Sequence, residues 1–176
     1  MAEHYKINEI PKQICPVCHK NSLILKEIET DLPNFGKAFI YTMECNACKF
    51  YKSDLEIKKQ DHGVIYSLDV NSEKDLSIKI AKSSTAKVKI GRIMTTEPGP
   101  VSQGFITNIE GLLKRAKHTL QQSYDSEEDK SKKKKLKNML KKISNVILGR
   151  DKITITIEDP NGNSVILSKK AVKKKI

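Results

Sequence analysis

The sequence predicts a mostly β protein that carries an inserted α-helical hairpin. Three observations indicate this: two C-x-x-C pairs 26 residues apart, several short segments in which apolar and polar residues alternate, and two longer segments with apolar residues at helical spacing. A period of two is typical of half-buried strands, whereas a period near 3.6 is typical of amphipathic helices. A chain of 176 residues suffices for one domain with a small appended module.

The four cysteines occur as two C-x-x-C motifs that predict a metal site. Two such turns facing each other supply four sulfurs in the tetrahedron that Zn²⁺ accepts. Between them, a strand at 23–28, a turn at 31–36 and a returning strand at 38–43 form a hairpin that places the second motif beside the first. We therefore predict a zinc-ribbon module over residues 12–57 with one structural zinc, held by Cys15, Cys18, Cys45 and Cys48.

Other uses of the cysteines fit the sequence less well. Disulfides need an oxidising compartment, and the N-terminus MAEHYKINEI shows no secretory signal. A redox-active pair favours a strand-to-helix context and needs only one motif. Four sulfurs leave no position for water, which disfavours a catalytic zinc. Because no apolar run is long enough for a membrane helix, we expect a cytoplasmic protein with no membrane partner.

The sequence pattern predicts a β-rich domain from 58 to 168. Alternating residues predict a strand at 50–57 that leaves the second cysteine motif, followed by strands at 64–70, 76–81 and 87–90. Residues 95–104 contain two prolines and two glycines, which predict a loop.

Two amphipathic segments predict the helical hairpin, at about 107–148. Thr107 and Glu110 have the spacing of a capping box, and the apolar residues that follow fall on one helical face. An acidic link at 124–131 precedes a second helix at 132–148, and Gly149 suits the position after its end.

The chain returns to β structure after the helices. Residues 152–158 alternate, the sequence Asp159-Pro160-Asn161-Gly162-Asn163 has turn chemistry, and a short strand follows at 165–167, so we predict a β-hairpin. The basic tail at 169–176 is expected to be frayed.

The formal net charge of +12 is concentrated in two short segments. Eight lysines lie in residues 130–142 and five in 169–175, and without them 20 basic and 21 acidic side chains remain. One interpretation is an electrostatic patch for RNA, the ribosome or an acidic protein; the other is a solvated helix face. The candidate patch residues on the second helix are Lys132, Lys133, Lys134, Lys135, Lys137, Lys141 and Lys142.

Four motifs in order carry a family resemblance. A D-L-P-x-F-G turn lies between the cysteine pairs, and a D-L…K-S stretch, a G-x-x-T-x-I-E-G-L-L segment and a D-P-x-G-N-S turn follow at 75–83, 104–113 and 159–164. Together with the C-x-x-C pairs they resemble the ZPR-type zinc-finger family (zinc finger protein ZPR-one), whose archaeal relatives also carry a single module. The resemblance covers roughly residues 14–168.

The resemblance implies a fold and a function. The fold would be a four-cysteine zinc ribbon followed by a double-stranded β-helix-like domain with the helical hairpin inserted. Eukaryotic members, which carry two modules, bind translation elongation factor one-alpha and assist its folding. We therefore expect a zinc-binding, non-enzymatic protein-interaction module, a chaperone or adaptor for a translation elongation factor. The alternative is an RNA- or ribosome-associated zinc-ribbon protein that uses its lysine clusters.

The family-like motifs also supply candidate partner contacts, each with a structural alternative. Glu110 is one, although together with Gly111 it fits a helix start better. Lys82 and Ser83 fit an acidic partner or a solvated strand end. Asp159 and Asn163 fit a partner contact or turn chemistry. The chain shows no serine, histidine and aspartate or cysteine and histidine catalytic set and no phosphate-binding loop, so we expect no enzymatic activity.

Overall fold

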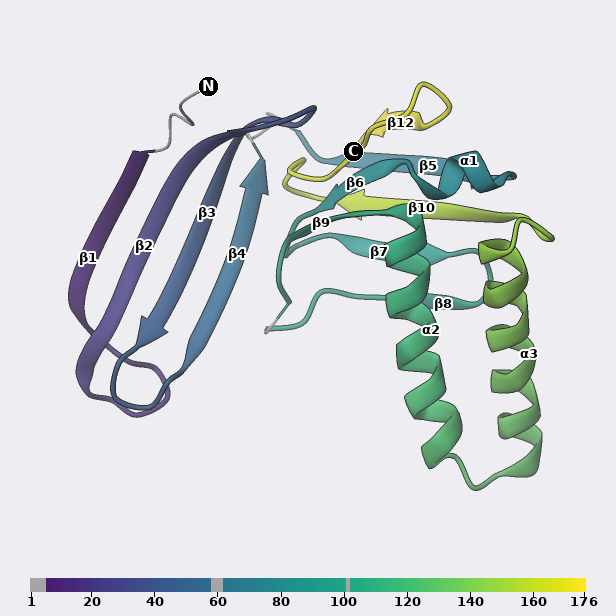
Figure 1. The fold of residues 1–176 in the computed structure, drawn as a ribbon, viewed down its shortest axis with the longest axis horizontal. Coiled ribbons are helices and arrows are strands. Elements are labelled where there is room, and N and C mark those ends of the chain that lie inside the picture. The colour runs from purple at the N-terminus through teal and green to yellow at the C-terminus, as the bar shows by residue number, and fades with distance from the viewer. Residues whose placement is uncertain (1–5, 58–61, 101) are drawn as a thin grey trace.

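The protein consists of an extended four-stranded sheet beside a body of two further sheets and three helices (Figure 1). The computed structural model describes residues 6–57, 62–100 and 102–176. The first sheet is antiparallel, with its strands in chain order: β1 (Lys6–Ile14), β2 (Asn21–Leu32), β3 (Gly36–Cys45) and β4 (Tyr51–Ile57). The predicted domain boundary at residue 58 lies outside the described residues.

The hairpin of β2 and β3 forms the centre of this sheet. The two strands pair continuously from Leu23 opposite Cys45 to Leu32 opposite Gly36. The strand β1 was not predicted, because nearly all of its side chains are exposed and so show no buried alternation. Pro11 and the left-handed Lys12 also interrupt the pairing of β1 with β2 between Ile10 and Gln13.

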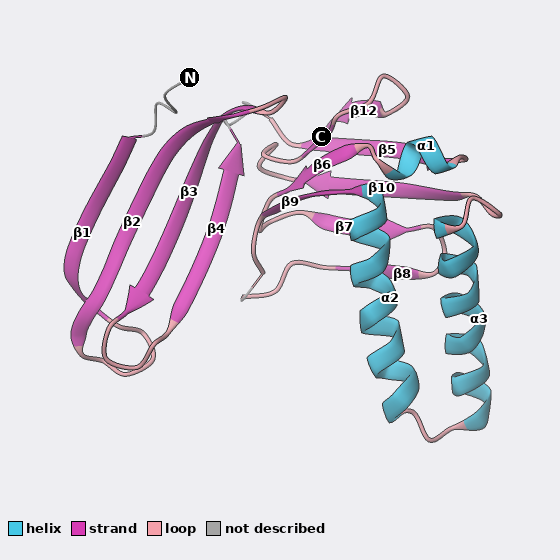
Figure 2. Ribbon diagram, viewed as in Figure 1, coloured by secondary structure: helices cyan, strands magenta, loops and turns pink. Residues whose placement is uncertain are grey.

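Two antiparallel sheets and three helices build the body (Figure 2). The five-stranded sheet has the order β12-β5-β10-β7-β8 and the three-stranded sheet the order β11-β6-β9. The elements are β5 (Val64–Val70), α1 (Glu73–Leu76), β6 (Lys79–Lys82), β7 (Lys87–Ile90), β8 (Met94–Thr96), β9 (Phe105–Asn108), α2 (Ile109–Ser126), α3 (Lys130–Ile147), β10 (Ile153–Asp159), β11 (Val165–Ile166) and β12 (Val172–Lys175).

The core of the body lies on one face of the five-stranded sheet. Ile155 of β10 is paired with Leu68 of β5 and Ile90 of β7, and all three side chains are buried. Directly paired residues point to the same face of a sheet, so such rows form a continuous apolar layer. Apolar residues of α2, α3 and β6 join the same cluster. The prediction of a mostly β fold with an inserted helical hairpin is confirmed.

The predicted β-hairpin at the end of the chain is wrong. β10 pairs with β5 and β7, whereas β11 pairs with β6 in the other sheet. A two-residue type I′ hairpin turn needs positive φ at both central residues, but of Asn161 and Gly162 only Gly162 has it, at 72°. The turn therefore carries the chain from one sheet to the other.

Other local predictions also need correction. The strand predicted at 76–81 begins only at Lys79, because Leu76 ends α1 and Ser77 is the cap that follows it. The capping prediction was misplaced as well: Asn108 caps α2 by accepting a hydrogen bond from the Gly111 N–H at 2.8 Å, while Thr107 belongs to β9. The predicted loop at 95–104 includes the end of β8.

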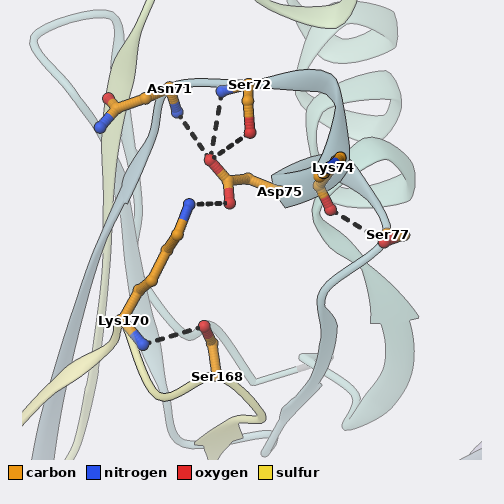
Figure 3. Close-up of polar contacts among 7 residues, drawn as sticks. All are labelled: Asn71, Ser72, Lys74, Asp75, Ser77, Ser168 and Lys170. Carbon is orange, nitrogen blue, oxygen red and sulfur yellow. Dashed lines mark hydrogen bonds and ion pairs between the residues drawn. The ribbon is translucent and has the colours of Figure 1, made fainter.

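The basic tail is a strand, so the expectation of fraying is wrong. β12 pairs with β5 from Val172 opposite Ser67 to Lys175 opposite Val64. Ahead of it, the Lys170 ammonium lies 2.6 Å from Asp75 Oδ1 (Figure 3). Asp75 Oδ2 accepts hydrogen bonds from Asn71 and Ser72. The tail is therefore attached by a backbone ladder and a buried carboxylate.

The helical hairpin packs on the body only at its base. α2 buries five apolar side chains, but α3 buries only Ile143 and Val146, both near its C-terminal end. Figure 1 shows the far ends of both helices extending beyond the sheets. Within the described ranges, no helix is long and apolar enough to cross a membrane.

Candidate metal centre

The two C-x-x-C motifs form nearly identical turns at neighbouring strand ends. In each, the residue after the second cysteine donates its backbone N–H to the carbonyl of the first cysteine, at 2.9 Å for both His19 and Lys49. Both residues have left-handed φ values, 58° and 61°. The pairing of β2 with β3 brings the second turn beside the first, because Leu23 lies opposite Cys45. The fold thus juxtaposes the two motifs as their spacing predicts.

The four sulfurs have the separations that one tetrahedral zinc requires. All four lie within 4.8 Å of one another. The Cys15 and Cys48 sulfurs are 3.7 Å apart, as are those of Cys18 and Cys45. Zn–S bonds of about 2.3 Å place tetrahedral sulfurs about 3.8 Å apart. The cysteines form no disulfide, and the protein holds a single structural Zn²⁺ for which these four thiolates are the fitting ligands.

The electrostatics of the site also favour a cation. A hydrogen bond from the Ser22 hydroxyl, 3.2 Å from the Cys45 sulfur, helps to lower the pKa of that thiol to about 6. The pKa of Cys48 is raised to about 12: the Phe50 backbone amide lowers it, but desolvation and the other three sulfurs raise it by more. Four thiols this close cannot all ionise unless a positive charge lies among them. With four sulfur ligands, such an ion has no open position for a substrate.

Two of the family-like motifs meet inside the body, at Asp159. Its carboxylate accepts hydrogen bonds from the Ser83 hydroxyl at 2.8 Å, the Thr85 hydroxyl at 2.9 Å and the Asn161 N–H at 3.0 Å. Burial raises the pKa of Asp159, but the hydrogen bonds, from Ser164 first, lower it by more, so it lies below its ordinary value. The expectation of a solvated strand end at Ser83 is wrong, since its side chain is buried.

The remaining candidate partner residues lie apart from one another. Asn163 is buried, and its Oδ1 has no hydrogen-bond partner within the described part of the chain. Lys82 is buried too, beside a cavity, so it is no solvated strand end either. Glu110 lies in the first turn of α2 and forms an ion pair with Lys114 at 2.7 Å. The partner contacts predicted at these residues and at Ser83 and Asp159 remain proposals.

The junction between the ribbon and the body was not predicted from the sequence. Asp54 of β4 accepts a hydrogen bond from the Gly104 N–H at 2.7 Å. A Cβ at Gly104 would overlap the carbonyl oxygen of Leu55, so the close approach requires glycine. One half of this contact had a sequence signal, because Gly104 is the first residue of the G-x-x-T motif. Its partner in β4 is distant in sequence and carried no signal.

The seven candidate lysines of α3 lie mostly in solvent. Six are exposed, and Lys133 is half-buried with its ammonium 5.0 Å from the centre of the Tyr124 ring. None of the seven forms an ion pair with another residue that the structure describes. We call Lys132–Lys135, Lys137, Lys141 and Lys142 the α3 lysine patch.

Known proteins resemble this chain over nearly its whole length. A ZPR1-like protein of Pyrococcus horikoshii is 33% identical across 97% of this chain and 79% of its own. A ZPR1-like protein of Methanocaldococcus jannaschii is 33% identical over 87% of this chain and 78% of its own. The zinc finger chaperone zpr1 of Schizosaccharomyces pombe is 27% identical over 88% of this chain but only 34% of its own length.

The sequence model of the ZPR1 jelly-roll domain matches residues 74–175, which include most of the two-sheet body. A jelly roll is built from two antiparallel sheets, as the body is. The four-cysteine site, the jelly-roll body and the archaeal relatives together establish that this chain belongs to the ZPR1 family of zinc-finger proteins.

Proposed function

We propose that this protein is a non-enzymatic chaperone or adaptor that binds translation elongation factor one-alpha in the cytoplasm. The family resemblance supports the choice of partner, and a fission-yeast relative is named a zinc finger chaperone. The observation that carries the proposal is an apolar row on the ribbon that lies outside the hydrophobic clusters of the described residues. A chaperone needs such a surface, because its clients expose apolar side chains before they finish folding.

The apolar row crosses all four strands of the ribbon. Ile7 of β1 pairs with Ile28 of β2, which pairs with Ile40 of β3, which pairs with Leu55 of β4. Paired residues share a face, so the four side chains form one row. None of them belongs to either hydrophobic cluster of the described residues. Ile7 is 50% exposed, and the other three side chains are half-buried. Contiguous exposed apolar surface is typical of a protein-interaction site.

The two faces of β1 provide a matched test. Ile7 and Ile10 are similarly exposed, at 50% and 56%, but their odd spacing along the strand puts them on opposite faces. We expect Ile7→Asp to weaken binding of purified elongation factor one-alpha about tenfold or more, and Ile10→Asp to weaken it little. Surface plasmon resonance with the zinc-loaded protein measures both.

A refolding assay completes the test. The wild-type protein should raise the yield of active elongation factor recovered from denaturant, and Ile7→Asp should abolish the gain. If the purified proteins do not bind, or if both variants bind as tightly as the wild type, the proposal is wrong.

A second candidate function rests on the α3 lysine patch. Lys132–Lys135 occupy the first turns of α3, which contain no acidic residue. Positive charge near a helix N-terminus opposes the helix dipole, so these lysines do not stabilise the helix. Three of these four lysines are exposed at the far end of the hairpin, which suits contact with the phosphates of RNA or the ribosome.

The salt dependence of binding tests this second function. RNA affinity should fall steeply with salt, and replacing Lys132–Lys135 by Gln should flatten the slope, by about 0.7–0.9 for each phosphate that is no longer neutralised. The control replaces four exposed ribbon lysines by Gln, namely Lys6, Lys12, Lys20 and Lys49. Equal reductions of the slope in both variants would indicate general charge attraction and exclude a defined patch.

A further inference from the structure

A cavity of about 390 Å³ lies between α2 and the strands of the body. Apolar side chains form much of its wall: Val88, Ile90 and Met94 come from β7 and β8, and Leu112 and Ala116 from α2. Uncharged polar residues complete the lining, among them Ser102 and Thr119. The volume falls within the usual range for small-ligand pockets, about 300–1,000 Å³. Two cationic side chains, Lys82 and Arg115, also line the cavity, so it is not simply a gap in the core.

Lys82 is buried without a carboxylate partner. Its side chain is only 6% exposed, and its ammonium donates one hydrogen bond, to the Ser102 hydroxyl at 2.9 Å. An ammonium has three N–H donors. No carboxylate among the described residues lies within 4.0 Å of it. Burial lowers the pKa of Lys82, which is the mark of an ammonium whose charge is incompletely compensated.

The two carboxylates whose charges act on Lys82, those of Asp54 and Asp159, already have hydrogen-bond partners. Asp159 accepts from Ser83 and Thr85, and Asp54 accepts from the N–H groups of Leu55 and Gly104. Both carboxylates raise the pKa of Lys82 through space, but neither reaches it. Because a buried charge is costly unless it is paired, the cavity beside Lys82 favours an anion.

Arg115 adds a second positive charge on the exposed side of α2. Its guanidinium carbon lies 4.4 Å from the centre of the Phe105 ring. Stacking on an aromatic ring restrains a guanidinium while its N–H donors stay free for a planar anion. The centre of the Phe105 ring lies 5.9 Å from the Lys82 ammonium as well, so both cations border the same aromatic side chain.

We propose that this cavity binds a carboxylate attached to an apolar group, with Lys82 and Arg115 pairing the carboxylate and the apolar walls holding the remainder. Such a ligand is a free short-chain carboxylic acid or the C-terminal carboxylate of a peptide that ends in an apolar residue. Both ligands present a carboxylate next to an apolar group. The inference does not depend on the elongation factor, because the site is complete within one chain.

Hexanoate and its uncharged analogue hexanamide test the proposal directly. We expect hexanoate to shift the backbone amide signals of Ser102, Gly104 and Phe105 in ¹H–¹⁵N spectra of the full zinc-loaded chain. Hexanamide should bind about tenfold or more weakly, since a hydrogen bond to a charged group is worth more than one to a neutral group. A peptide ending in leucine, compared with its C-terminal amide, shows whether a chain terminus also binds.

Three substitutions assign the site. Lys82→Met keeps the buried volume apolar and should weaken hexanoate binding about tenfold or more. Arg115→Gln changes an exposed side chain, so it keeps the test intact even if Lys82→Met fails to fold. Lys117→Gln is the control, because this exposed lysine on the same helix does not line the cavity. Equal binding of hexanoate and hexanamide, or full hexanoate binding by both site variants, would overturn the proposal.

Discussion

The ribbon and the body are both antiparallel β structures, but they are stabilised differently. The hydrophobic cluster of the ribbon buries three residues, Cys15, Leu23 and Cys45, two of which are metal ligands. The cluster of the body buries twenty apolar residues from its sheets and helices. A sheet with so small a core does not bury enough apolar surface to fold alone. Zinc therefore replaces the core in the ribbon, whereas apolar packing is sufficient in the body.

The ribbon and the body also offer different surfaces for binding. The apolar row of Ile7, Ile28, Ile40 and Leu55 lies outside the hydrophobic clusters of the described residues, and we propose that a partner covers it. The body uses its apolar residues internally and offers a cavity and the α3 lysine patch instead. We propose that the two regions are separate folding units, and the following predictions test that division.

Loss of zinc should have the largest effect, confined to the ribbon. Cys45→Ser removes one ligand, and structural zinc contributes about 10 kcal/mol or more to folding in small zinc modules. We expect amide hydrogen exchange to become fast throughout β1–β4 and to remain slow in β5 and β10. Chelation of the wild type should give the same pattern. If β5 and β10 lost protection together with the ribbon, the two regions would be one cooperative unit.

A substitution that leaves a void in the core of the body should destabilise the body and leave the ribbon intact. Ile155 is fully buried between Leu68 and Ile90. We expect Ile155→Ala to lower the free energy of unfolding of the body by about 3–4 kcal/mol. Urea unfolding monitored by circular dichroism measures the loss, and a zinc-release assay should give an unchanged metal content. Zinc loss in this variant would contradict the separation of the two units.

The junction at Gly104 should couple the two regions. A Cβ there would overlap the Leu55 carbonyl oxygen and meet Asp54 Oδ1 at 2.8 Å. We expect Gly104→Ala to cost about 2 kcal/mol, since the ribbon and the loop must move apart. Exchange at the amides of 54–55 and 104 should increase, whereas Gly99→Ala, which meets no atom within 4 Å, should leave exchange unchanged. No change at the junction in Gly104→Ala would show that the contact does not hold the regions together.

The Asp75 and Lys170 pair should make the body sensitive to acid. Chiefly the hydrogen bond from Lys170, with those from Asn71 and Ser72, lowers the pKa of Asp75 from 3.8 to about 2. A lowered pKa stabilises the fold above pH 3.8, and this contribution is lost as the pH falls through 2. Because Lys170 is 59% exposed, we expect Asp75→Asn to cost only about 1–2 kcal/mol at pH 7.

Thermal unfolding of wild type and Asp75→Asn between pH 7 and pH 2 measures this contribution. The difference in free energy should be constant above about pH 5 and should shrink toward zero at pH 2. A difference that did not depend on pH would mean that the carboxylate charge is unimportant.

The smallest effect on stability is expected from the α3 lysine patch. Lys134 and Lys135 are exposed and form no ion pair among the described residues, so replacing both by Gln should change the free energy of unfolding by less than about 0.5 kcal/mol. A clear stabilisation would show how strongly these charges oppose the helix dipole. A clear destabilisation, measured by urea unfolding, would indicate that they support the fold, contrary to the proposal of a binding patch.

Local signals in the sequence explain which elements were predictable. The cysteine spacing and the β2–β3 hairpin depend on residues near one another, so the grouping of the four cysteines could be predicted. The two long helices were also predicted, since their apolar stripes repeat over many residues. The exposed strand β1 was missed because it buries almost nothing.

The errors arise where distant residues decide the outcome. The turn after Asp159 has the composition of a β-hairpin, yet Ser83 and Thr85 bind the Asp159 carboxylate and direct the chain into the other sheet. The lysine-rich tail appeared too polar to pack, but the free edge of β5 pairs with its backbone whatever its side chains are.

The sequence by itself determined the zinc, the grouping of the four cysteines, the mostly β composition and the helical hairpin, because each depends on residue type and short-range spacing. Only the tertiary structure decided that Ser83 and Asp159 are bonded inside the body, that Lys82 is buried beside a cavity, and that Gly104 joins the ribbon to the body. Burial and long-range pairing are properties of the whole fold, and no local pattern records which distant group will complete a hydrogen bond or leave a charge without one.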